Sequence, residues 1–264
     1  MHSISQRATA EMFGTAVLVL VGPGTVVATL TLAGKTVPVV TEADFLAIAF
    51  AFGFVVMALV YAIGKVSGCH INPAVTFALA ATKRFPWKEV PVYWGAQFVG
   101  AVIGAFAVWG VFGSNAIELG MGQTHIAADA SSSVYLQAAL AEALGTGLLI
   151  FAILGIVDSK SPAQLAGIVI GGALVANILV FGPITGASLN PARAFGPELV
   201  RRSPAAQLSG HNMYRSTWSP ASSERRLRHS STTSWPPRAW SSSQSSKLSA
   251  TTTAAHPCVD NRCE

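Results

Sequence analysis

Long apolar stretches separated by short polar turns dominate the first 200 positions of the chain. A helix needs about 20 predominantly apolar residues to cross the hydrocarbon core of a bilayer. Five stretches have this length, and they predict five transmembrane helices, at residues 8–32, 45–64, 90–113, 135–157 and 163–181. The pattern therefore indicates an all-α membrane protein.

Two further apolar segments, at residues 71–81 and 189–200, have only about half of that length. In each of them Asn-Pro-Ala follows the first residue. Asparagine caps a helix N-terminus well, and proline fits the first turn because it has no N–H to lose. Short proline-initiated segments at corresponding places in two halves of a membrane protein are typical of broken helices that line a site near the midplane. We therefore expect two re-entrant half-helices.

The two halves of the chain resemble each other. AEMFGT at residues 10–15 matches AEALGT at 141–146, and SGCHINPA at 67–74 matches TGASLNPA at 185–192. A unit of three spans and one half-helix has an odd number of crossings, so its second copy must insert upside down. The sequence thus predicts an inverted repeat, with a first unit over about residues 8–113 and a second, incomplete unit from about residue 135.

Composition agrees with a membrane protein, because 51% of the residues are hydrophobic and only 11% are charged, against about 25% charged in soluble domains. Lys and Arg are enriched in the loops on the cytoplasmic side of membrane proteins. In this chain Lys35 falls on one predicted side, and the other side holds Arg7, Lys65, Lys83, Arg84, Lys88 and Lys160. This distribution predicts a cytoplasmic N-terminus in the cell membrane.

The pattern changes after position 200. Residues 201–264 hold 15 serines, nine Lys or Arg and three Asp or Glu, with no apolar run long enough to span a bilayer. The net positive charge of the chain lies in this tail and does not indicate nucleic-acid binding. The composition predicts a disordered, low-complexity segment in place of a sixth span. A reading-frame shift near Arg201 is a second hypothesis, because shifted codons for residues 229–236 can encode an apolar stretch; sequencing the coding DNA tests it.

The paired asparagines, Asn72 and Asn190, carry the chemistry. The N-terminus of each half-helix bears about half a positive elementary charge, and irregular backbone at membrane depth is tolerated where it lines a water-filled cavity. Side-chain amides that donate into such a cavity would orient passing water by its oxygen and interrupt proton hopping, while the positive field repels cations. The alternative interpretation is two ordinary helix caps.

These motifs resemble the signatures of the aquaporin (major intrinsic protein) family: SGCHINPAVT at residues 67–76, GASLNPARAFGP at 186–197, the two AExxGT segments, and Gln97 in the third span. The resemblance implies a passive water channel, not an enzyme, that assembles as a homotetramer in membrane lipid without metal or cofactor. It assigns the pore motifs to Asn72, Pro73, Ala74, Asn190, Pro191 and Ala192.

The resemblance also implies a narrow selectivity filter formed by Phe52, Ile178, Ala187 and Arg193. Arg193 has a separate argument, because a charged residue within an apolar membrane segment is costly and usually functional. The loop backbone before the half-helices is expected to line the pore, and the buried acids Glu11 and Glu142 to hold these loops. The loop positions are Gly68, Cys69, His70, Gly186 and Ser188.

Ile178 stands where specialised water channels typically have histidine, a pattern that resembles archaeal-type aquaporins and allows slow passage of glycerol. Ala194 stands where dedicated glycerol facilitators usually have aspartate. We therefore expect water as the main permeant and glycerol as a second one. Three alternatives stay open: a glycerol or small-solute facilitator, a secondary transporter, and a non-conducting product that lacks the sixth span.

Overall fold

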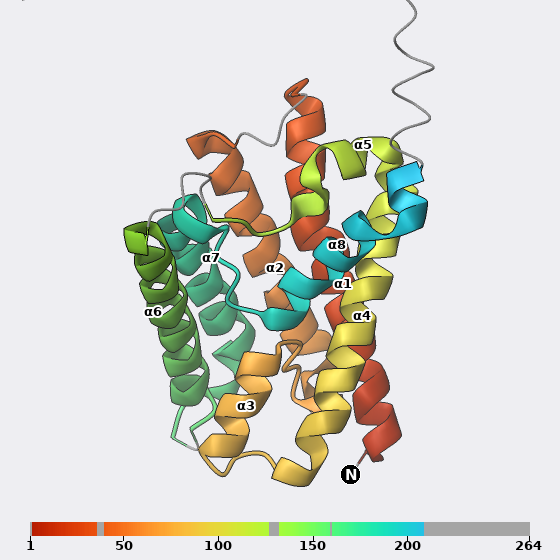
Figure 1. Ribbon diagram of the computed structural model, residues 1–264. Coiled ribbons are helices and arrows are strands. Elements are labelled where there is room, and N and C mark those ends of the chain that lie inside the picture. Colours follow the sequence, from red (N-terminus) through yellow and green to blue (C-terminus); the bar gives the residue numbers. More distant parts are fainter. Residues whose placement is uncertain (1, 36–39, 127–131, 159, 209–264) are drawn as a thin grey trace, which may run out of the picture. The chain divides into compact units, whose positions relative to one another are not determined.

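The computed structural model describes residues 2–35, 40–126, 132–158 and 160–208, and all regular structure within these ranges is helical. Five of the helices described there are long and apolar enough to cross a membrane. They are α1 (Ile4–Leu32), α2 (Glu42–Ser67), α4 (Val90–Phe112), α6 (Ser132–Ile156) and α7 (Ala166–Thr185) (Figure 1). The all-α membrane fold and its five predicted spans are thus confirmed.

Two short helices, α3 (Pro73–Ala81) and α8 (Pro191–Arg202), begin at the predicted prolines, each directly after an asparagine cap. The described part also contains a five-residue helix, α5 (Ser114–Glu118), and the 3₁₀ turns η1 (Trp87–Glu89), η2 (Gly120–Gly122) and η3 (Ala163–Leu165).

The predicted boundary of the tail at residue 201 differs from the structure. Helix α8 continues to Arg202, and residues 204–208 are helical as well. An ion pair between Arg202 and Glu198, one turn apart, supports this extension, and basic side chains suit the negative end of a helix. The rest of the predicted tail, residues 209–264, lies outside the described residues, and the frameshift hypothesis falls there too.

The inverted repeat is visible in the packing of α2 against α7. A Cβ added at Gly53 of α2 would lie 2.8 Å from the carbonyl oxygen of Gly171, and one added at Gly171 would lie 2.5 Å from that of Gly53. The two glycines occupy equivalent positions when the Asn-Pro-Ala motifs are aligned. Glycine lets two membrane helices approach until their backbones touch, so the two halves meet across a reciprocal contact.

The third span, α4, packs along both α1 and α8. Side chains at Gly100 and Gly104 would collide with the carbonyl oxygens of Met12 and Ala16 on α1. This small-residue face brings α4 close enough to α1 to reach the first half-helix loop, the segment between α2 and α3.

Glu11 of α1 is fully buried and holds that loop. Its carboxylate accepts hydrogen bonds from Ser67 Oγ at 2.7 Å, His70 N at 2.9 Å and Ile71 N at 2.6 Å. A fourth comes from Gln97 Nε2 of α4 at 2.8 Å. One carboxylate therefore joins α1, α4 and the loop.

Glu142 of α6 repeats this arrangement in the second half. It accepts hydrogen bonds from Thr185 Oγ1 at 2.5 Å, Ser188 N at 2.9 Å and Leu189 N at 2.8 Å. The three donors stand at the repeat equivalents of Ser67, His70 and Ile71. Both glutamates thus lie beside the half-helix loops. Glu142 is only partly buried, however, whereas the sequence predicted a buried acid at both positions.

The loops need this support because they contain residues in a conformation that favours glycine. The backbone φ angle is 52° at Cys69, 42° at Ile71, 46° at Ala187 and 47° at Leu189. For a β-branched residue such as Ile71 a positive φ is strained. The carboxylate bonds to the N–H groups of Ile71 and Leu189 offset this strain.

Replacing Glu11 by leucine tests the role of the carboxylate. Glu11→Leu leaves the donors of the first loop without their acceptor, and each buried unsatisfied group costs about 1–3 kcal/mol. We expect a clear fall in the thermal unfolding midpoint in detergent, a smaller fall for Glu11→Gln, and none for the exposed control Glu118→Gln. An unchanged midpoint for Glu11→Leu would contradict this role.

Candidate functional site

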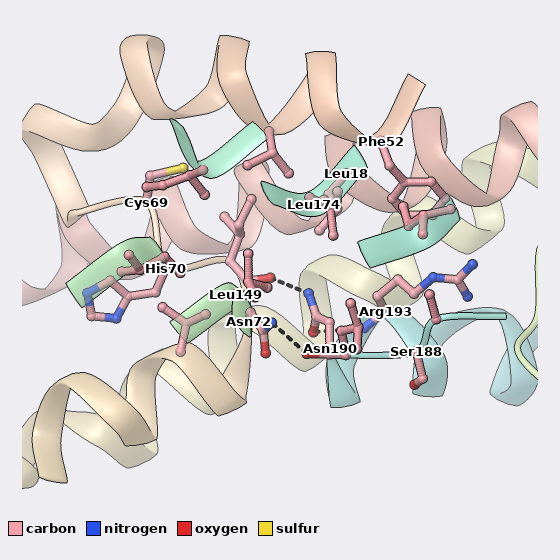
Figure 2. A pocket seen from close by; sticks show the side chains of 18 of the residues that line it. Leu18, Phe52, Cys69, His70, Asn72, Leu149, Leu174, Ser188, Asn190 and Arg193 are labelled. Atoms are coloured by element: carbon pink, nitrogen blue, oxygen red, sulfur yellow. Dashed lines mark hydrogen bonds between the residues drawn. The ribbon is translucent and has the colours of Figure 1, made fainter. Parts of the chain in front are cut away.

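The two half-helix loops are tied to each other by their capping asparagines (Figure 2). Asn72 Nδ2 donates to the carbonyl oxygen of Leu189 at 2.9 Å, and Asn190 Nδ2 donates to that of Ile71 at 2.8 Å. Each loop thus supplies one donor and one acceptor to the other. The N-termini of α3 and α8 are held next to each other by this reciprocal pair.

The side-chain oxygens of the same residues cap their own helices. Asn72 Oδ1 accepts from Ala74 N at 2.9 Å, and Asn190 Oδ1 accepts from Ala192 N at 3.1 Å and Arg193 N at 3.2 Å. Pro73 and Pro191 occupy the first helical positions, where no N–H is needed. An amide NH₂ group carries two hydrogens, so the bond across the loops uses one hydrogen of each asparagine.

A cavity of about 90 Å³ runs past this pair. Both asparagines line it, and so do Gly68, Cys69, His70, Ala187 and Ser188 of the two loops. Figure 2 shows Cys69 and His70 toward one end of the view, Asn72 and Asn190 near the centre, and Phe52 with Arg193 toward the other end. The predicted pore-motif asparagines and these loop positions are thus brought together around one cavity.

A second, wider cavity of about 590 Å³ adjoins the first. Phe52, Ile178 and Arg193 line both cavities, so these three side chains stand where the two meet. Ala187, the fourth predicted filter residue, lines the narrower cavity, and its neighbour Gly186 lines the wider one.

Arg193 lies in α8 with only 4% of its surface exposed. Its guanidinium carbon is 5.0 Å from the centre of the Phe52 ring, within the range of a cation–π contact. Nε and Nη1 have no hydrogen-bond partner within the described part of the chain. Both of these nitrogens are enclosed by the protein. Arg193 thus places a buried positive charge at the junction between the cavities.

Sequence reasoning missed most of the apolar lining of the narrow cavity. Leu18 of α1 and Leu149 of α6 line it, as do Val56 of α2 and Leu174 of α7. Each pair consists of repeat equivalents, so applying the repeat alignment to all four helices would have identified them. The resulting passage has apolar walls with polar groups confined to the two loops and Arg193.

The described ranges contain no group of three or more His, Cys, Asp or Glu side chains placed to hold a metal ion. The site consists of hydrogen-bond donors, carbonyl groups and apolar side chains around a passage.

Known proteins share this arrangement. The profile of the family described as Major intrinsic protein matches residues 1–220. Aquaporin AqpM of Methanothermobacter marburgensis is 44% identical over 211 residues, which cover 75% of this chain and 85% of that protein. Aquaporin NIP1-1 of Oryza sativa subsp. japonica is 36% identical over 196 residues, which cover 74% of this chain and 64% of that protein.

Among solved structures, the aquaglyceroporin from Plasmodium falciparum superposes with a TM-score of 0.65 at 28% identity, covering 75% of this chain and 81% of that one. Family profile, sequence relatives and structure agree with one another. The chain therefore belongs to the major intrinsic protein family, whose members are membrane channels for water and small solutes and not enzymes.

Proposed function

We propose that residues 1–200 form a passive channel that conducts water and excludes protons and ions. The observation that carries the proposal is the reciprocal pair of hydrogen bonds between the loops. It holds two helix N-termini and two asparagine amides beside one narrow cavity. A water molecule that passes this point turns its oxygen to the amides and the positive helix ends, which breaks the hydrogen-bonded chain along which protons hop.

The proposed selectivity filter is the ring of Phe52, Ile178, Ala187 and Arg193. Arg193 lines both cavities, so its guanidinium group is placed to donate to a permeant there, and its buried charge repels cations. Ile178 and Phe52 present apolar surface on the same ring, which suits the carbon backbone of a small polyol. We therefore propose water as the main permeant, with slow passage of glycerol.

We propose that the chain lies in the plasma membrane. Its N-terminus is proposed to face the cytoplasm. An ion pair of 2.7 Å joins Arg7 to Glu89, so the basic residues at positions 7 and 88 belong to the same end of the bundle. Lys35, which follows α1, forms an ion pair with Asp44 in the first turn of α2 instead. The positive-inside rule then favours the Arg7 end as cytoplasmic. We further propose a homotetramer with one pore in each subunit, on family resemblance.

Osmotic shrinkage of vesicles that contain the purified full chain tests water conduction. We expect faster shrinkage than in empty vesicles. Ile178→Trp should return the rate to that of empty vesicles, because the larger ring fills the junction of the cavities. Val180→Trp is the matched control on α7, since Val180 is exposed. A rate equal to that of empty vesicles for the unaltered chain, or an equal effect of both substitutions, would overturn the proposal.

Glycerol uptake into the same vesicles tests the filter. Ile178→His replaces apolar surface by a ring that binds water, so it should disfavour the carbon backbone of glycerol. We expect the ratio of glycerol to water permeability to fall by about tenfold, which corresponds to about 1.4 kcal/mol. A ratio that stays the same or rises would exclude Ile178 from the filter.

A further inference from the structure

The two halves of the structure differ in how their first helices are covered. In the first half, α4 packs along α1 and contacts α8. In the second half, α6 is the equivalent of α1, and in the described residues it packs mainly against α7, with a smaller contact to α3. In Figure 1, α4 runs beside α1, whereas α6 stands at the edge of the bundle.

Individual positions on α6 show the same difference. Met12 and Ala16, whose carbonyl oxygens meet the glycines of α4, correspond to Ala143 and Gly147. Both of these are exposed, and a Cβ added at Gly147 would meet no described atom within 4 Å. The flank of α6 thus has the small residues of a close helix contact and, in the described ranges, no helix against it.

The half-helices differ in a similar way. Phe195 of α8 packs edge-on against Phe98 of α4, with ring centres 5.2 Å apart. Its repeat equivalent on α3, Phe77, contacts Trp87 of the η1 turn instead, although the two rings are exposed to a similar extent, 50% for Phe77 and 44% for Phe195. The difference lies in the partner: among the described residues, the ring on α8 packs against α4, whereas the ring on α3 packs against a turn, so the flank beside α6 continues onto α3.

Glu142 gives this flank a polar centre. Glu142 accepts hydrogen bonds from Thr185, Ser188 and Leu189, which correspond to three of the donors to Glu11. The fourth donor to Glu11 is Gln97, which belongs to α4. A cavity of about 500 Å³ opens beside Glu142, Thr185 and Ser188. Lipid tails fill apolar space but donate no hydrogen bond, so the carboxylate favours a protein helix over lipid.

We propose that the flank formed by α6 and α3 is a docking groove for a transmembrane helix of another polypeptide. This helix is apolar, presents two small residues four positions apart to Ala143 and Gly147, and places a side-chain amide against Glu142. Helix α4 shows the required chemistry, because it bears Gly100 and Gly104 on one face and Gln97 toward Glu11. Residues 209–264 contain no apolar run of this length, which favours a separate polypeptide as the source.

A synthetic fluorescent peptide with the sequence of residues 87–112 serves as the probe, titrated into vesicles that contain the full chain. We expect saturable binding. Gly147→Leu should weaken it by about tenfold, because the added side chain blocks the close approach. Gly172→Leu is the matched control, an exposed glycine of α7 with open space around it, and should leave binding unchanged. Equal thermal unfolding midpoints of the two variants would exclude misfolding as the cause.

A second peptide with Gln97→Leu tests the polar contact. It should bind about fivefold more weakly to the unaltered chain, as expected for the loss of one interhelical hydrogen bond. Absence of binding would overturn the proposal. Binding that Gly147→Leu does not change would also overturn it, because the peptide would then displace α4 from α1. This readout is binding, so its failure is distinguishable from a failure of water conduction.

Discussion

The carboxylates of Glu11 and Glu142, the first fully buried and the second partly buried, form the hydrogen bonds on which the rest of the site depends. Each joins a membrane helix to a non-helical loop at membrane depth, where backbone N–H groups have no water to bind. They hold Ile71 and Leu189 in left-handed conformations. In that conformation the carbonyl oxygens of the same two residues accept the amides of Asn190 and Asn72. The carboxylates and the asparagine pair therefore form one hydrogen-bonded unit that joins the two halves of the chain.

This hydrogen-bonded unit brings the polar groups of the two loops together at one level of the narrow cavity. The walls of the passage come from apolar repeat-equivalent side chains, such as Leu18 with Leu149. Among the described residues that line the narrow cavity, the polar ones belong to the two loops, apart from Arg193. Arg193 is positioned by its place in α8 and by the ring of Phe52. A mainly apolar passage with a few fixed polar groups binds a permeant weakly enough to release it. The inverted repeat therefore supplies both the symmetric fold and the paired groups on which the proposed function depends.

Much of the fold follows from local sequence signals. The spans, the proline starts of α3 and α8, and the inverted repeat depend on hydrophobicity, capping and an internal match, all of which are readable along the chain. The bonds from Asn72 to Leu189 and from Asn190 to Ile71 were not predicted, because they join residues more than a hundred positions apart. The helical residues beyond position 200 were missed for another reason: serine and arginine composition outweighed the helix-end charges that stabilise α8. The family resemblance supplied the four filter positions; the contact of Arg193 with Phe52 required the structure.

The most direct test of the central claim measures water and proton permeability together in vesicles that contain the full chain. Water permeability is followed by light scattering after an osmotic step, and proton flux by a pH-sensitive dye inside the same vesicles. We expect water permeability above that of empty vesicles, with proton flux equal to theirs. Proton flux that rises with the amount of protein, or water permeability no higher than in empty vesicles, would contradict it.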